Sequence, residues 1–149
     1  MEGEQRVRLM MEADINQICE LEKKCFSEPW SFNLIRSGVG SPVDTYFVYE
    51  ARGEILGYSV MRILADEGEI QRIAVLPAYR RQGIARKLMD AMMISARRKG
   101  ARAMALEVRE SNLGARRLYI SYGFKQEAVR RGYYHNPAED AVIMWNRRI

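Results

Sequence analysis

The sequence predicts an α/β fold of the α+β kind, with one domain built on a mixed sheet that carries helices on both faces. Short β-rich runs alternate with helical patterns in the order β-α-α-β-β-β-α-β-α-β-β. A chain of 149 residues has room for only one full-sized core. We therefore expect residues 1–149 to form a single domain.

The N-terminal part of the chain predicts one strand followed by two helices. Residues 7–9 alternate between apolar and charged side chains, as in a strand. Apolar residues recur at helical spacing over 12–26, and Pro29 ends that pattern. Ser31 is then placed to cap a short second helix over 31–36.

Three strands are predicted in the middle of the chain. The β-rich runs 45–51 and 54–65 are separated by Arg52-Gly53, a pattern typical of a hairpin. Residues 69–76 form a further strand, because apolar side chains continue up to a proline.

The C-terminal part predicts two helices and three strands. A long helix over 82–99 has Gly100 as its C-cap, and the nearly all-apolar strand 103–108 follows. Asn112 is the candidate N-cap of a helix that runs to Tyr122. Closing strands are expected near 125–131 and 139–145.

Charge and hydropathy narrow the class of protein. The net charge of +5 and pI near 9.4 favour an anionic partner, either a nucleic acid or a phosphorylated cofactor. No run approaches ~18 apolar residues and no signal peptide is visible, so we expect a cytoplasmic protein without a membrane partner. Cys19 and Cys25 match no metal-ligand spacing, so we expect free thiols and no metal.

The stretch between the strand 69–76 and the long helix has the chemistry of an anion site. Backbone N–H groups and the helix dipole at a helix N-terminus attract a pyrophosphate, and Arg80 and Arg81 add charge there. Gly83 lets phosphate oxygens approach the backbone closely. Taken alone, these residues also fit an ordinary capped helix.

A resemblance to a known family suggests a specific ligand for this stretch. RRQGIA, residues 80–85, resembles the [RQ]-x-x-G-x-[GA] coenzyme A loop of the GNAT superfamily of N-acetyltransferases, which tolerates Ala85 in place of glycine. Within that superfamily the chain is most similar to ribosomal-protein-alanine N-acetyltransferases and to the catalytic subunits of protein N-terminal acetyltransferases. Three stretches in the right order carry the resemblance: EIQRIAVLPAYRRQGIARKLM, ALEVRESNLGARRLYISYGF, and RRGYY with EDAVIM.

The resemblance implies a GNAT domain with a mixed, mostly antiparallel central sheet. It implies transfer of an acetyl group from acetyl-CoA to the N-terminal α-amine of a protein, most simply an alanine N-terminus of a ribosomal protein. The residues it implies for acetyl-CoA binding are Ile73, Ala74, Val75, Arg80, Arg81, Gln82, Gly83, Ile84, Ala85 and Asn112.

The same resemblance makes Glu107 the general base and Tyr119 the general acid. Glu107 is also the one charged residue near the carboxyl end of an apolar strand, where α/β sheets place their ligand sites. A structural salt bridge of Glu107 to Arg109 or Arg72 is the alternative. Tyr119 lies on a helical apolar stripe, so a core aromatic is its alternative role.

The acceptor amine is expected between two loops of the chain. In the resembling enzymes the loop between the first two helices and the last hairpin flank the entering peptide, and each aromatic residue there also fits a simple loop anchor. Glu69 is the rival base; its alternatives are a solvated strand residue or a residue that helps to bind the substrate amine. The expected substrate-binding residues are Phe26, Pro29, Trp30, Glu69, Tyr133 and Tyr134.

Three other functions fit parts of the sequence. The acceptor could be a lysine side chain or a small-molecule amine, which leaves the chemistry unchanged. A non-catalytic coenzyme A-binding module would keep the loop 80–85 and not need Glu107. A nucleic-acid-binding domain would gather arginines and aromatic residues on one face, whereas these arginines surround a loop suited to pyrophosphate, so we expect no stable nucleic-acid partner.

Overall fold

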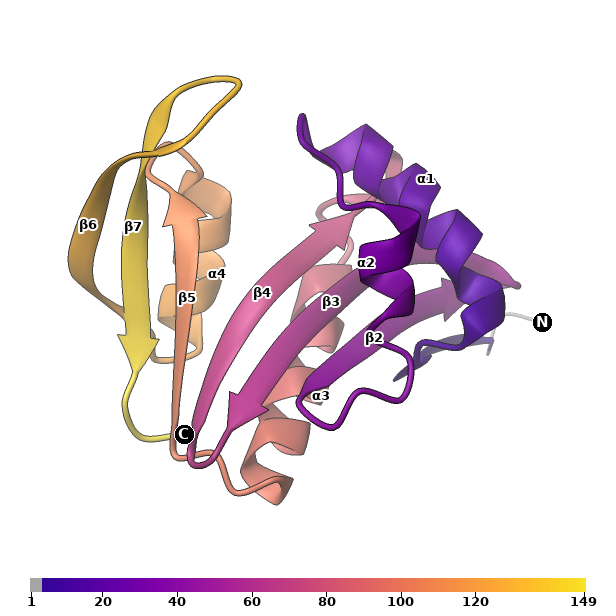
Figure 1. Ribbon diagram of the computed structural model, residues 1–149, viewed down its shortest axis with the longest axis horizontal. Coiled ribbons are helices and arrows are strands. Elements are labelled where there is room, and N and C mark those ends of the chain that lie inside the picture. Colours follow the sequence, from indigo (N-terminus) through magenta and orange to yellow (C-terminus); the bar gives the residue numbers. More distant parts are fainter. Residues whose placement is uncertain (1–3) are drawn as a thin grey trace.

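The computed structural model describes residues 4–149, which contain one sheet of seven strands and four α-helices (Figure 1). The strands are β1 (Gln5–Leu9), β2 (Asp44–Ala51), β3 (Glu54–Leu64), β4 (Glu67–Val75), β5 (Ala103–Arg109), β6 (Lys125–Tyr134) and β7 (Glu139–Asn146). The helices are α1 (Ile15–Cys25), α2 (Phe32–Arg36), α3 (Ile84–Arg98) and α4 (Leu113–Ser121), with 3₁₀ turns η1 (Glu12–Asp14) and η2 (Pro77–Tyr79). This order confirms the predicted succession of strands and helices.

Two local features form as their side chains predict. Arg52 and Gly53 join β2 to β3 with φ values of 54° and 81°, the left-handed pair that a tight hairpin turn requires. Ser31 Oγ accepts a hydrogen bond of 3.1 Å from the Leu34 amide, which confirms Ser31 as the N-cap of α2.

Some predicted boundaries move by a few residues. The helix expected over 12–26 begins as the 3₁₀ turn η1 before α1 continues it. Lys99 rather than Gly100 is the C-cap of α3, and Gly100 follows with a φ of 91°, the position where a left-handed glycine ends many helices. β6 extends past Arg131 to Tyr134, because Tyr134 pairs with Glu139 across the last hairpin.

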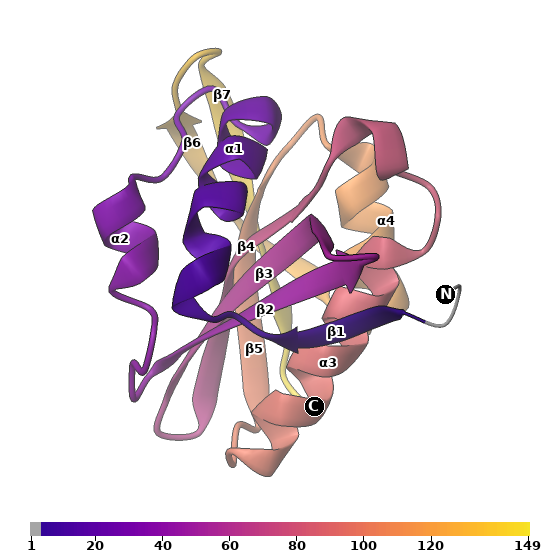
Figure 2. The ribbon, with the colours of Figure 1, turned by 90° about the vertical axis from the view of Figure 1, so that its right-hand side faces the viewer.

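Helices cover both faces of the sheet (Figure 2). A separate hydrophobic core lies under each helical layer. The core under α1 and α2 contains Ile15, Ile18, Leu21, Ile35, Tyr46, Val48, Tyr58 and Val60. The core under α3 and α4 contains Leu88, Met89, Met92, Met104, Leu106, Val108, Tyr119 and Phe124. Side chains that alternate along the strands supply both cores.

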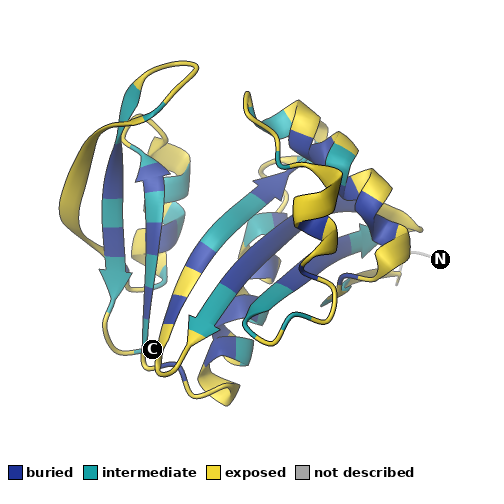
Figure 3. Ribbon diagram, in the orientation of Figure 1, coloured by how far each residue is buried: buried dark blue, intermediate teal, exposed yellow. Residues whose placement is uncertain are grey.

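On one face of the sheet, helices cover only some of the strands. α1 and α2 lie over β2, β3 and β4, whereas in the part of the chain that the structure describes no helix lies over β5, β7 and β6 on that face (Figure 1). β6 is exposed along nearly its whole length, while β3 is mostly buried (Figure 3). One face of the C-terminal half of the sheet is therefore open. No helix among residues 4–149 is long and apolar enough to cross a membrane.

The sheet order is β1-β2-β3-β4-β5-β7-β6, and β4 and β5 form its one parallel pair within the described residues. Their ladder joins only Glu67–Ile70 of β4 to Ala103–Leu106 of β5. At the end of the ladder β4 has a bulge at Gln71, because Val60 of β3 pairs with Arg72 while Met61 pairs with Ile70. Beyond the bulge, β4 and β5 separate (Figure 1).

Candidate active site

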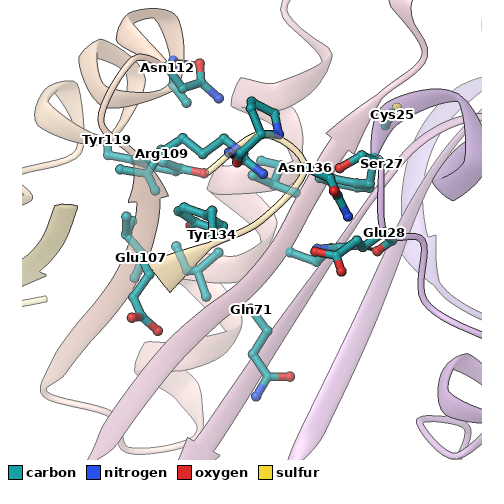
Figure 4. A pocket seen from close by; sticks show the side chains of 18 residues that line it. Cys25, Ser27, Glu28, Gln71, Glu107, Arg109, Asn112, Tyr119, Tyr134 and Asn136 are labelled. Carbon is teal, nitrogen blue, oxygen red and sulfur yellow. Dashed lines mark hydrogen bonds between the residues drawn. The ribbon is translucent and has the colours of Figure 1, made fainter. Parts of the chain in front are cut away.

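The separation of β4 from β5 opens a cleft of about 460 Å³ at the carboxyl ends of both strands (Figure 4). Its walls come from five segments: β4, β5, α4 with its N-cap, the loop after α1, and the β6–β7 turn. Among the side chains that line it are Phe26, Ser27, Glu28, Gln71, Arg72, Ile73, Glu107, Asn112, Tyr119 and Tyr134. The cleft thus brings together residues from distant parts of the chain.

Glu107 and Tyr119 enter this cleft from the two faces of the sheet. On β5, Leu106 and Val108 face the core under α3 and α4, to which Tyr119 of α4 also belongs. Glu107 lies between them in the strand, so its side chain points to the opposite face. A reaction at the opening can therefore use both groups at once.

The Glu107 carboxylate is partly exposed and has a cation beside it. Arg130 Nε of β6 lies 3.1 Å from Glu107 Oε2. This contact lacks hydrogen-bond geometry, and among residues 4–149 the buried Oε2 has no hydrogen-bond partner. The negative charge of Glu107 raises the pKa of Tyr133. One carboxylate oxygen can therefore still accept a proton or a hydrogen bond.

The alternative role expected for Glu107, a salt bridge to Arg109 or Arg72, is wrong, because both arginines bind other carboxylates. Arg109 lies 3.3 Å from Glu139 and donates to the backbone carbonyls of His135 and Pro137. Arg72 instead binds Glu22, as described below.

Tyr119 is both a core residue and a cleft residue. Its ring packs edge-on against Phe124, with centroids 6.1 Å apart, and only 5% of the residue is exposed. Burial raises the pKa of Tyr119, and the neighbouring Tyr134 adds to the effect. The hydroxyl therefore keeps its proton at neutral pH and can serve as a proton donor.

The start of α3 is open to solvent. Gly83 is the N-cap of α3 with a φ of 82°, and a Cβ placed there would meet no atom within 4 Å. Arg81 and Gln82 are exposed beside it, while Ile84 is buried and Ala85 packs against the core. The backbone N–H groups of the first turn thus face free space, as anion binding requires.

Arg80 is exposed, but its guanidinium folds back onto the end of β4. Its Nε donates a hydrogen bond of 3.0 Å to the Val75 carbonyl, and its Nη2 lies 3.7 Å from Cys25 Sγ. The guanidinium therefore covers the carboxyl end of β4.

The free edge of β4 offers backbone groups to the cleft. The Leu76 amide bonds to the Leu56 carbonyl of β3, and Ala74 pairs with Tyr58 in the same register. Because backbone groups alternate in direction along an antiparallel strand, those of Ile73 and Val75 point away from β3. Ala74, expected to contact the cofactor, instead uses its backbone inside the sheet and buries its side chain under α1.

Asn112 lies where α4 begins, at the edge of the cleft. Its Oδ1 accepts a hydrogen bond of 3.2 Å from the Ala115 amide, which confirms it as the N-cap of α4. Asn112 also lines the cleft.

The structure brings only some of the expected acceptor residues to the cleft. Phe26 and Tyr134 line it, and Tyr133 packs edge-on against Tyr134 at 5.1 Å. Trp30 is half-buried, and the Arg72 guanidinium lies over both its ring and the Phe26 ring. Pro29 is exposed in the same loop, and Glu69 lies outside the cleft lining, 3.2 Å from Gln71.

Sequence reasoning missed a buried ion pair beside the cleft. Glu22 of α1 is fully buried and accepts two hydrogen bonds from Arg72 of β4. A signal for it exists in the sequence, because Glu22 follows Ile15 by seven positions and Ile18 by four. A carboxylate on the apolar face of a helix is buried, so it needs a cation or hydrogen-bond donors beside it.

Comparison with known proteins agrees with this geometry. Residues 15–124 match the model of the acetyltransferase (GNAT) family. The chain belongs to this family and is an N-acetyltransferase, as the coenzyme A loop motif predicts. Acetyltransferases with this fold take the acetyl group from acetyl-CoA, and the solved ones include a protein in complex with coenzyme A.

Particular relatives are similar over nearly the whole chain. The ribosomal protein bS18-alanine N-acetyltransferase of Haemophilus ducreyi is 33% identical over 141 residues, which cover 93% of this chain and 97% of the relative. The crystal structure of the ribosomal-protein-S18-alanine N-acetyltransferase from Escherichia coli matches with a TM-score of 0.87 and 29% identity, covering 95% and 92%. Ard1 from Thermoplasma volcanium also matches with a TM-score of 0.87, at 27% identity, covering 97% and 98%.

Proposed function

We propose that this enzyme transfers the acetyl group of acetyl-CoA to the N-terminal α-amine of a protein, and that its acceptor is an alanine N-terminus of a ribosomal protein. The observation that carries the proposal is the opening between β4 and β5, which Glu107 and Tyr119 enter from opposite faces. The names of the bS18-alanine N-acetyltransferases that resemble the chain support the choice of acceptor. Residues 1–149 act as one catalytic domain.

The residues around the cleft fit acetyl-CoA. The open first turn of α3 at Gly83 would hold the pyrophosphate, with Arg81 and Gln82 beside it. The backbone groups of Ile73 and the amide of Val75, which point away from β3, would bond the amide-bearing arm of coenzyme A, as a neighbouring strand would. The Val75 carbonyl already accepts from Arg80. Ile84 and Ala85 set the geometry of that turn, Arg80 orders the strand end, and Asn112 closes the cleft from α4.

The two catalytic residues divide the proton transfers. Acetyl-CoA supplies a thioester carbonyl as the acyl donor. Glu107 accepts a proton from the attacking amine, directly or through one water, while the new C–N bond forms. Tyr119 donates its hydroxyl proton to the sulfur as the C–S bond breaks. Its neutral, buried hydroxyl suits this role.

The acceptor would approach from the face of the sheet that no described helix covers. Glu107 points to that face, and Phe26, Tyr133 and Tyr134 stand at its edge. Pro29 and Trp30 belong to the loop after α1. Glu69 lies on the same open face, but on the segment of β4 that still pairs with β5, outside the cleft lining. An open face beside a narrow cleft suits an extended chain with one terminal amine, so the expected partner is a peptide or protein.

A peptide panel tests the proposal. Purified protein is incubated with acetyl-CoA and peptides that differ in their first two residues, and the mass gain is read by mass spectrometry. We expect acetylation of free N-termini that begin with alanine, and none when that amine is blocked. Gain on internal lysines alone would contradict the α-amine acceptor, and binding of acetyl-CoA without any transfer would contradict catalysis.

A further inference from the structure

A buried ion pair ties the loop after α1 to β4 at the edge of the cleft. Both carboxylate oxygens of Glu22 are saturated. Oε1 accepts from Arg72 Nη2 at 2.7 Å and from the Trp30 amide at 2.8 Å. Oε2 accepts from Arg72 Nε at 3.0 Å and from the Tyr58 hydroxyl. A charge that is fully buried needs such a set of donors.

The Arg72 guanidinium also holds the loop through its flat face. It lies 3.6 Å from the centroid of the Phe26 ring and 4.7 Å from that of the Trp30 ring. Its Nη2 donates a further hydrogen bond of 3.4 Å to the Glu28 carbonyl. One side chain therefore contacts the loop by two aromatic stacks and one backbone hydrogen bond.

Apart from this ion pair, the loop is held by the packing of Phe26 and Trp30 against the core under α1 and α2. It connects α1 to α2 without regular secondary structure, and its residues Phe26, Ser27 and Glu28 form one wall of the cleft. Among the described residues, the hydrogen bonds that join the backbone of 27–30 to the remainder of the fold end on Glu22 or Arg72. The position of this wall therefore depends on the ion pair.

We infer that Arg72, clamped by Glu22, is a positioning residue that sets the shape of the acceptor side of the cleft and so determines acceptor binding and selectivity. This inference rests on the proposed function, because it names the part of the cleft that receives the peptide. Arg72 directly follows the bulge at Gln71, where β4 no longer pairs with β5. A shift of its side chain therefore moves the loop relative to the opening of the cleft.

Two variants test this role without leaving an unpaired buried charge. Arg72→Lys keeps the charge but loses the bidentate contact and the flat face. The double variant Glu22→Gln with Arg72→Met removes both charges together, which preserves folding better than removal of one partner. The matched control is Arg62→Lys, because Arg62 forms a bidentate pair with Asp44 on neighbouring strands, at 2.7 and 3.0 Å, and lies outside the cleft lining.

We expect both Arg72 variants to raise the KM for an acceptor peptide roughly tenfold while the KM for acetyl-CoA changes less than about twofold. Discrimination between peptides with different first residues should fall, and the control should behave as wild type. A purely structural defect would change both KM values together, and equal effects of that kind would overturn the inference. So would an unchanged peptide KM in folded variants.

Trp30 provides a second, activity-independent readout. The chain has two tryptophans, so a Trp145→Phe background leaves Trp30 as the single fluorescent reporter. We expect acrylamide to quench Trp30 more strongly in the Arg72 variants, because the ring loses its stacked cation. Unchanged quenching would contradict the clamp even if no peptide is acetylated, so failure of the inference and failure of the proposed function are distinguishable.

Discussion

Glu107 and Tyr119 line the same cleft, yet they belong to opposite faces of one sheet. The interruption between β4 and β5 is what allows the two side chains to share a space. An acyl donor and an amine can then meet at the opening from different sides, with a proton acceptor on one side and a proton donor on the other.

Replacing Glu107 by glutamine should lower kcat with an acceptor peptide by roughly 10² to 10⁴, the usual contribution of a positioned base. Binding of acetyl-CoA should stay unchanged, because Glu107 faces away from α3. Glu110→Gln is the matched control, since Glu110 is exposed just beyond the end of β5. Steady-state kinetics and calorimetry check this, and a Glu107→Gln enzyme with wild-type kcat would exclude Glu107 as the base.

Replacing Tyr119 by phenylalanine should lower kcat roughly tenfold or more, because a proton donor to the leaving sulfur is lost. Burial raises the pKa of Tyr119, so its donor form persists as the pH rises. The wild-type rate should therefore show no loss from Tyr119 between about pH 6 and about pH 9. Tyr122→Phe is the control, because its hydroxyl bonds Asp90 outside the cleft. An unchanged kcat in Tyr119→Phe would contradict the role.

Cys25 lines the cleft but should not carry the acetyl group. Burial raises the pKa of its thiol, so the neutral form prevails and the sulfur is a weak nucleophile. Cys25→Ala should keep kcat within about threefold of wild type. Initial-rate plots against both substrates should intersect, as direct transfer requires. Parallel lines, or an acetylated Cys25 found by mass spectrometry, would show a covalent intermediate instead.

The Gly83→Ala variant tests whether the start of α3 binds acetyl-CoA, once the loss of stability from backbone strain is accounted for. Alanine at a φ of 82° should cost about 1–2 kcal/mol of stability, although its Cβ meets no atom within 4 Å. Gly40→Ala is matched, with a φ of 74° and equally open space. Both variants should lose similar stability in thermal unfolding, but only Gly83→Ala should weaken acetyl-CoA binding, roughly fivefold or more. Equal affinity in the two variants would argue against the α3 site.

Local chemistry explains why much of the fold is predictable from the sequence. The Arg52-Gly53 turn and the Ser31 cap depend on neighbours within a few residues, and both form as predicted. Asn112 likewise caps its helix as predicted, whereas α3, expected to begin at Gln82, begins two residues later with Gly83 as its N-cap. Hydrophobic periodicity placed the strands and helices in the right order, because each element buries one side of itself.

The candidate site was less predictable where residues depend on distant partners. Arg130 lies beside Glu107 only because β6 pairs with β7 and β7 with β5. The same holds for Glu22 and Arg72, which meet across two elements. Glu69 was expected near the amine but lies on the paired segment of β4, before the opening begins. No local pattern shows where a parallel ladder stops.

The short ladder between β4 and β5 also affects how the chain assembles. β1 to β4 pair as antiparallel neighbours and are complete once Val75 has been synthesised, whereas β5 follows only after the whole of α3. Until then β4 presents an unpaired edge, and such edges are the usual templates for aggregation. A nascent chain stalled within α3 therefore exposes the whole edge of β4, both the segment that later pairs with β5 and the segment that we propose binds acetyl-CoA.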